Sequence, residues 1–97
     1  MELARLTERV LWVRGPANVG IILLENSNVA LIDSGCDEQF ARKLHELLSD
    51  YRFKVSHILN THAHADHIGG NSYFQEKCGC RIMASTLEAP TIRQPLI

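Results

Sequence analysis

The sequence has no long apolar run and no leader-like segment at its start. Its longest apolar stretch, Val19 to Leu24, is far shorter than the roughly 20 residues that a membrane-spanning helix needs. Residues 1–10 alternate charged and apolar side chains, where a signal peptide would have an uninterrupted apolar segment. We therefore expect a soluble, cytoplasmic chain with no membrane partner.

An excess of charge of one sign is also missing. The 97 residues include 10 Lys and Arg and 11 Asp and Glu, which gives a formal net charge of −1. Without a basic excess there is no electrostatic reason to bind nucleic acid, so we expect a small-molecule partner instead. The three cysteines are odd in number and too few for a disulfide framework, and we interpret Cys36, Cys78 and Cys80 as reduced thiols.

Short aliphatic runs predict how the chain begins. Residues 10–15, 19–25 and 29–35 are separated by turn-forming residues, which predicts three strands joined by hairpins. The apolar period then changes to that of an amphipathic helix, and Asp37 is placed to cap its N-terminus. The residues that share the apolar face of this helix are Phe40, Leu44, Leu47, Leu48 and Tyr51.

The second half of the chain repeats the alternation of strand and helix. Residues 54–60 predict a buried strand, residues 71–79 a second helix ended by Gly79, and residues 81–84 a last strand. The predicted order is β-β-β-α-β-α-β. We therefore predict an α/β (α+β) fold, with a mostly antiparallel sheet covered by helices, in a single domain spanning residues 1–97.

The strongest chemical signal is the stretch 61–71, which reads THAHADHIGGN. His62, His64, Asp66 and His67 lie within six residues of one another. Imidazole nitrogens and carboxylate oxygens are ligands that Zn²⁺ accepts, and the alternation of an extended loop makes two adjacent metal sites easier to build than one. The alternative is a polar loop whose histidines only hydrogen-bond one another or water.

The flanking residues are consistent with a site. The histidines follow a predicted buried strand, and Gly69 and Gly70 allow the backbone to approach closely without Cβ clashes. Asp33 ends a neighbouring predicted strand. It can hold an imidazole N–H from behind the metal ligands, or it can simply form the turn before Ser34 and Gly35.

The stretch THAHADHIGGN resembles the signature of the metallo-β-lactamase superfamily, and LIDSG at 31–35 resembles the shorter motif that precedes it there. The resemblance implies a four-layer αββα sandwich, of which this chain would be the N-terminal αβ half. It also implies that His62 and His64 bind a first metal and that Asp66 and His67 bind a second. Because some lactamase relatives carry arginine at the position of His67, the chain is more similar to glyoxalase II and lactonases than to true β-lactamases.

The activity implied by this resemblance is metal-dependent hydrolysis. A metal-activated water would attack an ester, thioester or lactone-type carbonyl, with two Zn²⁺ per complete site, or Fe or Mn in their place. Asp66 would also act as a catalytic residue by steering the proton. Two alternatives are a non-catalytic metal-binding or interaction module that retains the histidine loop, and an iron-dependent redox member of the fold.

The later ligands of the family have no counterpart in this chain, because no histidine or aspartate follows His67. We therefore expect a truncated domain that carries only part of the site. Half a sandwich would leave the apolar inner face of its sheet exposed. We expect such a chain to associate with itself or with a complementing C-terminal half.

The remaining candidate residues have ordinary structural interpretations. We expect His45 to be a surface residue, His57 to be a hydrogen-bonded histidine inside its strand, and Cys36 to be a small buried residue. Trp12 and Tyr51 are predicted to anchor the core. Cys78-Gly-Cys80 has too few thiols for a convincing metal site.

Overall fold

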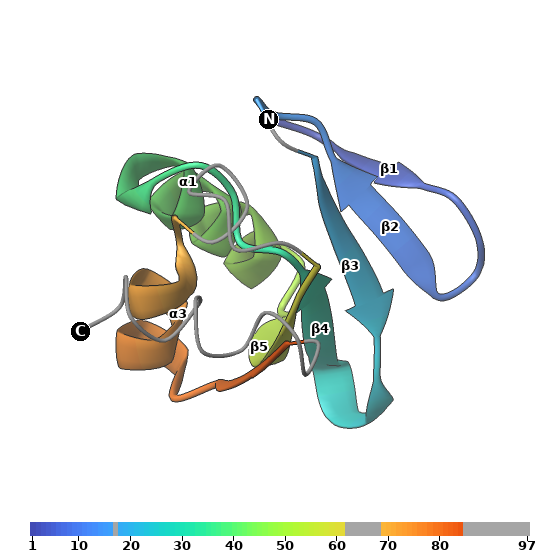
Figure 1. Ribbon diagram of the computed structural model, residues 1–97. Helices are drawn as coiled ribbons and strands as arrows, with labels where there is room; N and C mark the ends of the chain where they lie inside the picture. The colour runs from blue at the N-terminus through green and yellow to red at the C-terminus, as the bar shows by residue number, and fades with distance from the viewer. Residues whose placement is uncertain (17, 62–68, 85–97) are drawn as a thin grey trace.

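The structure is a computed structural model that describes residues 1–16, 18–61 and 69–84. Within these ranges the chain forms six strands, two α-helices and a short 3-10 turn, η1 (Figure 1). The elements are β1 (Leu3–Arg5), β2 (Val10–Val13), β3 (Val19–Leu23), η1 (Glu25–Ser27), β4 (Asn28–Ile32), α1 (Glu38–Asp50), β5 (Lys54–Asn60), α3 (Asn71–Cys78) and β6 (Arg81–Ala84).

The six strands form one sheet whose spatial order follows the sequence from β1 to β6. Strands β1 to β4 are antiparallel neighbours, whereas β5 runs parallel to both β4 and β6. Parallel neighbours need a crossover, and α1 and α3 supply the two crossovers. The predicted α/β fold class is confirmed, and β1 is one strand more than the sequence predicted.

Both described helices lie on the same side of the sheet (Figure 1). The carboxylate of Asp37 caps α1 by accepting a hydrogen bond from the Phe40 amide at 2.8 Å, as predicted. Leu44 and Leu48 of α1 and Phe74 of α3 are fully buried against the sheet. The strand residues of this core include Leu11, Val13, Val19, Ile21, Val29, Leu31, Val55 and Ile58.

Two predicted core anchors are wrong. Tyr51 is 55% exposed, because α1 ends at Asp50 and Tyr51 is its C-cap residue. Trp12 is half-buried, because Leu11 and Val13 on either side of it point into the core and the strand alternation turns Trp12 to the opposite face. There Trp12 lies beneath Arg14, whose guanidinium carbon is 5.8 Å from the ring centroid.

The sheet face away from the helices carries an apolar row across all six strands. Residues directly opposite each other on paired strands share a face, and the register connects one residue of each strand to the next. The row consists of Ala4, Trp12, Gly20, Ile32, Leu59 and Met83. Trp12, Ile32 and Leu59 are half-buried and Met83 is 40% exposed.

The two helices contact each other through a histidine that we expected at the surface. His45 of α1 is half-buried, and its Nδ1 lies 3.0 Å from the hydroxyl of Tyr73 in α3. That expectation is therefore wrong, because α3 covers this turn of α1. His57 matches its predicted role: it lies within β5, and its Nδ1 is 2.8 Å from the Ser56 hydroxyl.

In the part of the chain that the structure describes, no helix has the length and apolar character needed to cross a bilayer.

Candidate functional site

The turn after β4 contacts Thr61, the residue directly before His62. Asp33 is 4% exposed and has a left-handed backbone, with φ of +66°, which aspartate tolerates better than most residues. One carboxylate oxygen accepts a hydrogen bond from the Thr61 amide at 2.8 Å, and the other accepts one from the Thr61 hydroxyl at 2.7 Å. Asp33 therefore fixes the position at which the chain leaves β5.

The same turn also contacts Gly69 and Gly70, which follow the histidine segment in the sequence. The Gly69 amide donates to the Gly35 carbonyl at 2.8 Å, and the Gly70 amide donates to the Ser34 hydroxyl at 3.1 Å. A Cβ on Gly69 would overlap the Cys36 carbonyl, and one on Gly70 would overlap the Ser34 carbonyl oxygen. Only glycine leaves room for these contacts with the turn after β4, whereas the predicted approach of the two glycines to the metal site stays a prediction.

A buried polar network joins the two sides of this arrangement. Asn71 donates through Nδ2 to Oδ1 of Asn60 at 2.7 Å, and Asn60 donates through Nδ2 to Oδ1 of Asn71 at 3.3 Å. The hydroxyl of Ser34 also donates to Oδ1 of Asn71. We name Ser34, Asn60 and Asn71 the amide network. The sequence places one asparagine at the end of a predicted buried strand and another directly after Gly69-Gly70, but it does not show that their side chains pair.

The predicted metal ligands His62, His64, Asp66 and His67 lie outside the described residues. Of the predicted site residues the structure describes Asp33, which accepts hydrogen bonds from Thr61, the residue directly before His62. Within the described ranges, no group of three or more His, Cys, Asp or Glu side chains could hold a metal ion. The donor set of the segment itself, three imidazoles and a carboxylate, fits a divalent metal such as Zn²⁺.

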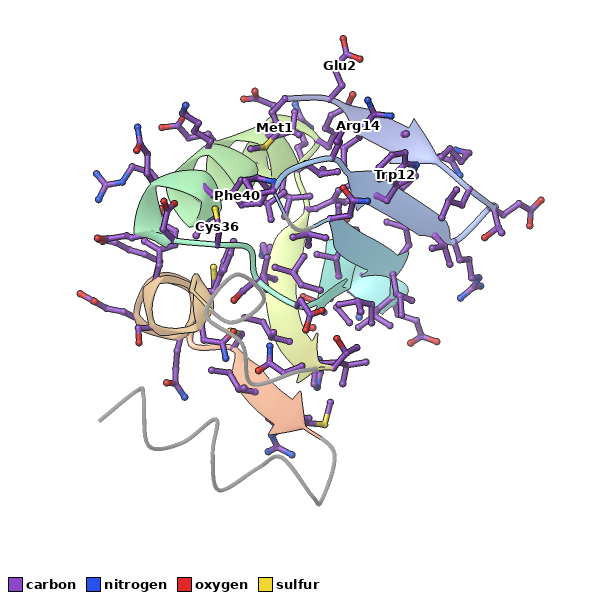
Figure 2. All side chains as sticks on the ribbon, turned by 45° about the horizontal axis from the view of Figure 1, so that its top comes forward. Met1, Glu2, Trp12, Arg14, Cys36 and Phe40 are labelled. Carbon is purple, nitrogen blue, oxygen red and sulfur yellow. The ribbon has the colours of Figure 1, made fainter. Side chains whose placement is uncertain are left out.

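The cysteines are free thiols in the structure. Cys36 is half-buried rather than buried, and it lies with Phe40 near the beginning of α1 (Figure 2). Burial raises the pKa of the Cys78 thiol. Burial, to which the charge of Cys78 adds, raises the pKa of Cys80 to about 11. Both thiols therefore stay protonated at neutral pH.

Together, the fold and the site define a helix-covered mixed sheet in which the turn after β4 contacts Thr61 and Gly69, the described residues on either side of the histidine-rich segment. A family model described as the metallo-beta-lactamase superfamily matches residues 12–96. The chain therefore belongs to the metallo-β-lactamase superfamily, as the two motifs predicted.

Relatives with different activities match the chain at similar identity. It is 32% identical over 75 residues to a metallo-beta-lactamase type 2 of Bacillus cereus, covering 76% of this chain and 28% of that protein. It is 33% identical over 63 residues to a hydroxyacylglutathione hydrolase of Pelagibacter ubique, covering 65% of this chain and 25% of that protein. The chain thus spans about a quarter of the length of these relatives.

Solved structures agree with the fold. A B3 metallo-beta-lactamase with an active-site glutamic acid superposes with a TM-score of 0.81 at 25% identity, covering 96% of this chain and 36% of that one. MEM-A1, a subclass B3 metallo-beta-lactamase from a soil metagenome library, gives a TM-score of 0.76 at 29% identity, covering 90% and 34%. The chain thus aligns, over nearly all its length, with about a third of each of these structures.

Proposed function

We propose that this chain carries part of the metal centre of a metal-dependent hydrolase, with His62, His64, Asp66 and His67 as ligands. One observation carries the proposal. Thr61, directly before His62, and Gly69, the next described residue after the segment, are both hydrogen-bonded to the turn that follows β4. The residues on both sides of the segment 62–68 are therefore bonded to the same turn, which lowers the entropic cost of gathering its donors around a cation.

The donor set favours Zn²⁺, with two ions in a complete site, and Fe or Mn as other possibilities. Such metals supply Lewis-acid chemistry: they polarise a carbonyl and lower the pKa of water. Within this chain, Asp66 would hold and pass on a proton at its carboxylate, in addition to acting as a ligand. Asp33 would orient His62 from behind by fixing Thr61, its neighbour in the chain.

The substrate class that we propose is a small molecule with an ester, thioester or lactone-type carbonyl. Hydroxyacylglutathione hydrolase, by its name, hydrolyses an acyl derivative of glutathione, which supports an acyl carbonyl as the group attacked. Histidine at position 67 supports this branch of the family over true β-lactamases. A net charge of −1 favours a small molecule over nucleic acid.

The remaining ligands would come from outside these 97 residues. The apolar row through Trp12, Ile32 and Leu59 offers a surface on which a complementing half, or a second copy of the chain, would pack. The native mass of the protein distinguishes these two arrangements.

Elemental analysis of the purified chain, together with its native mass, tests the proposal. We expect bound zinc in the wild-type chain and the loss of most of it when His62 and His64 are both replaced by alanine. His57→Ala is the matched control, because His57 lies in β5 and is bonded to Ser56. Wild-type metal content in the His62→Ala/His64→Ala variant would refute these ligands, and iron in place of zinc would favour the redox alternative.

A further inference from the structure

The buried polar side chains of the described residues gather at one end of the sheet. They are Asp33 at 4% exposure, Ser34 at 0%, Asn60 at 4% and Asn71 at 0%, whereas the other buried side chains belong to the hydrophobic core. Burying an amide is costly unless it is hydrogen-bonded, so such groups are poor choices where only stability is needed. Their concentration at the residues that flank the histidine segment indicates that this end of the sheet keeps those residues in fixed positions.

Two of these residues bracket the segment in the sequence. Asn60 stands directly before Thr61, and Asn71 stands directly after Gly70. Their side chains pair reciprocally at 2.7 and 3.3 Å, so the pair bridges the two positions at which the chain leaves β5 and enters α3.

Ser34 closes the arrangement through a third element. Its hydroxyl donates to Asn71 and accepts from the Gly70 amide at 3.1 Å. The amide network therefore connects the end of β5, the start of α3 and the turn after β4 within a buried region that water does not reach. Hydrogen bonds in such surroundings are stronger than in water, and they set distances closely.

We infer that Ser34, Asn60 and Asn71 are positioning residues that hold the two ends of the histidine segment at a fixed separation before any ligand arrives. The inference deepens the proposed function, on which its consequence for metal affinity rests. Preorganised ends reduce the ordering cost that a ligand must offset when it binds.

Hydrogen exchange of two backbone amides tests the inference without metal. The amides of Thr61 and Gly69 report on the two ends, and their acceptors, Asp33 and Gly35, are not substituted. The variants are Asn71→Leu, which removes the reciprocal pair, and Ser34→Ala, which removes one hydroxyl and preserves the fold if Asn71→Leu does not. Phe74→Leu is the matched control, because it weakens the core of the same helix but leaves the amide network intact.

We expect both amides to exchange about tenfold faster in Asn71→Leu and Ser34→Ala than in Phe74→Leu at matched global stability, since a buried donor or acceptor loses its partner. Exchange that rises only as much as in Phe74→Leu would overturn the inference.

Zinc affinity, measured by competition with a chromophoric chelator, provides the second readout. We expect it to fall about tenfold in the same two variants and to stay unchanged in Phe74→Leu. A wild-type chain that takes up no zinc would contradict the proposed function, whereas the exchange rates would still decide the inference. Bound zinc with equal affinity in all four proteins would overturn the role in metal binding.

Discussion

Replacing Gly70 with alanine tests whether the close contact between Gly70 and the turn after β4 is required for the stability of the fold. Gly70 has φ of −96° and ψ of 0°, a conformation that alanine adopts without strain. The added Cβ would overlap the Ser34 carbonyl oxygen and lie 2.8 Å from Cβ of Ala41. The whole penalty is therefore steric, and neither obstacle can rotate away, since one is backbone and the other a helix Cβ.

Gly79 offers the opposite case and serves as the control. Its φ of +63° is left-handed, but a Cβ placed there would have nothing within 4 Å. Gly79→Ala should therefore cost only the conformational penalty, about 1 kcal/mol. Gly70→Ala must move the turn after β4 or the start of α3, so we expect a loss of about 3 kcal/mol or more in the free energy of unfolding.

Thermal unfolding followed by circular dichroism measures the difference. In a domain of this size 1 kcal/mol corresponds to about 4 to 8 °C, so we expect Tm to fall by about 12 to 24 °C for Gly70→Ala and by about 4 to 8 °C for Gly79→Ala. Urea unfolding with unchanged slopes would show that both variants keep a two-state transition. A fall for Gly70→Ala no larger than that for Gly79→Ala would refute the steric argument.

Two further predictions concern titratable side chains. Asp33→Asn removes the charged group that accepts both Thr61 hydrogen bonds, so we expect the free energy of unfolding in urea to fall by about 1 to 2 kcal/mol. Asp37→Asn is the control and should change little, because asparagine retains a capping side chain. Equal losses in the two variants would contradict this prediction. Because burial raises the pKa of Cys80 from 9.0 to about 11, the unfolded chain releases this proton first, and the thiol should destabilise the fold progressively between pH 9 and 11. Alkylation by iodoacetamide, read by mass spectrometry, should show Cys80 unmodified at pH 8 and reactive near pH 11; rapid modification at pH 8 would contradict the raised pKa.

Periodicity predicted the elements whose pattern is local. The positions of Leu44 and Leu48 in α1, and the hairpins through β2, β3 and β4, follow directly from apolar spacing. Strand β1 was missed because its three residues, Leu-Ala-Arg, are too few to show a strand pattern and depend on pairing with β2. Trp12 was assigned to the wrong face, since alternation shows which residues share a face but not which face is covered.

The candidate site likewise has one part that a local sequence pattern shows and another that only the fold brings together. The histidine segment stands out in the sequence because all four candidate ligands lie within six residues, and their role as metal ligands stays a prediction. The amide network could not be predicted, because its contacts join residues that are far apart in the sequence. Ser34 and Asn71 are 37 residues apart, and Asn60 and Asn71 are 11 residues apart. Those separations are fixed by the packing of α3 against β5 and α1, which no local pattern encodes.

The change of strand direction within the sheet explains why the turn after β4 and the end of β5 lie together, although they are far apart in the sequence. Strands β3 and β4 are antiparallel, so the C-terminal end of β3 lies at the opposite end of the strands from the C-terminal end of β4. Strand β5 is parallel to β4, with Ile32 beside Leu59, so the turns that follow both strands emerge side by side. The amide of Asp33 donates to the Leu59 carbonyl at 2.8 Å and continues the ladder into the turn. The carboxylate of Asp33 can therefore reach Thr61, 28 residues later in the chain, because α1 returns the chain to run parallel to β4. An antiparallel β5 would have finished at the opposite end of the sheet, so that Thr61 would lie away from Asp33 and Ser34.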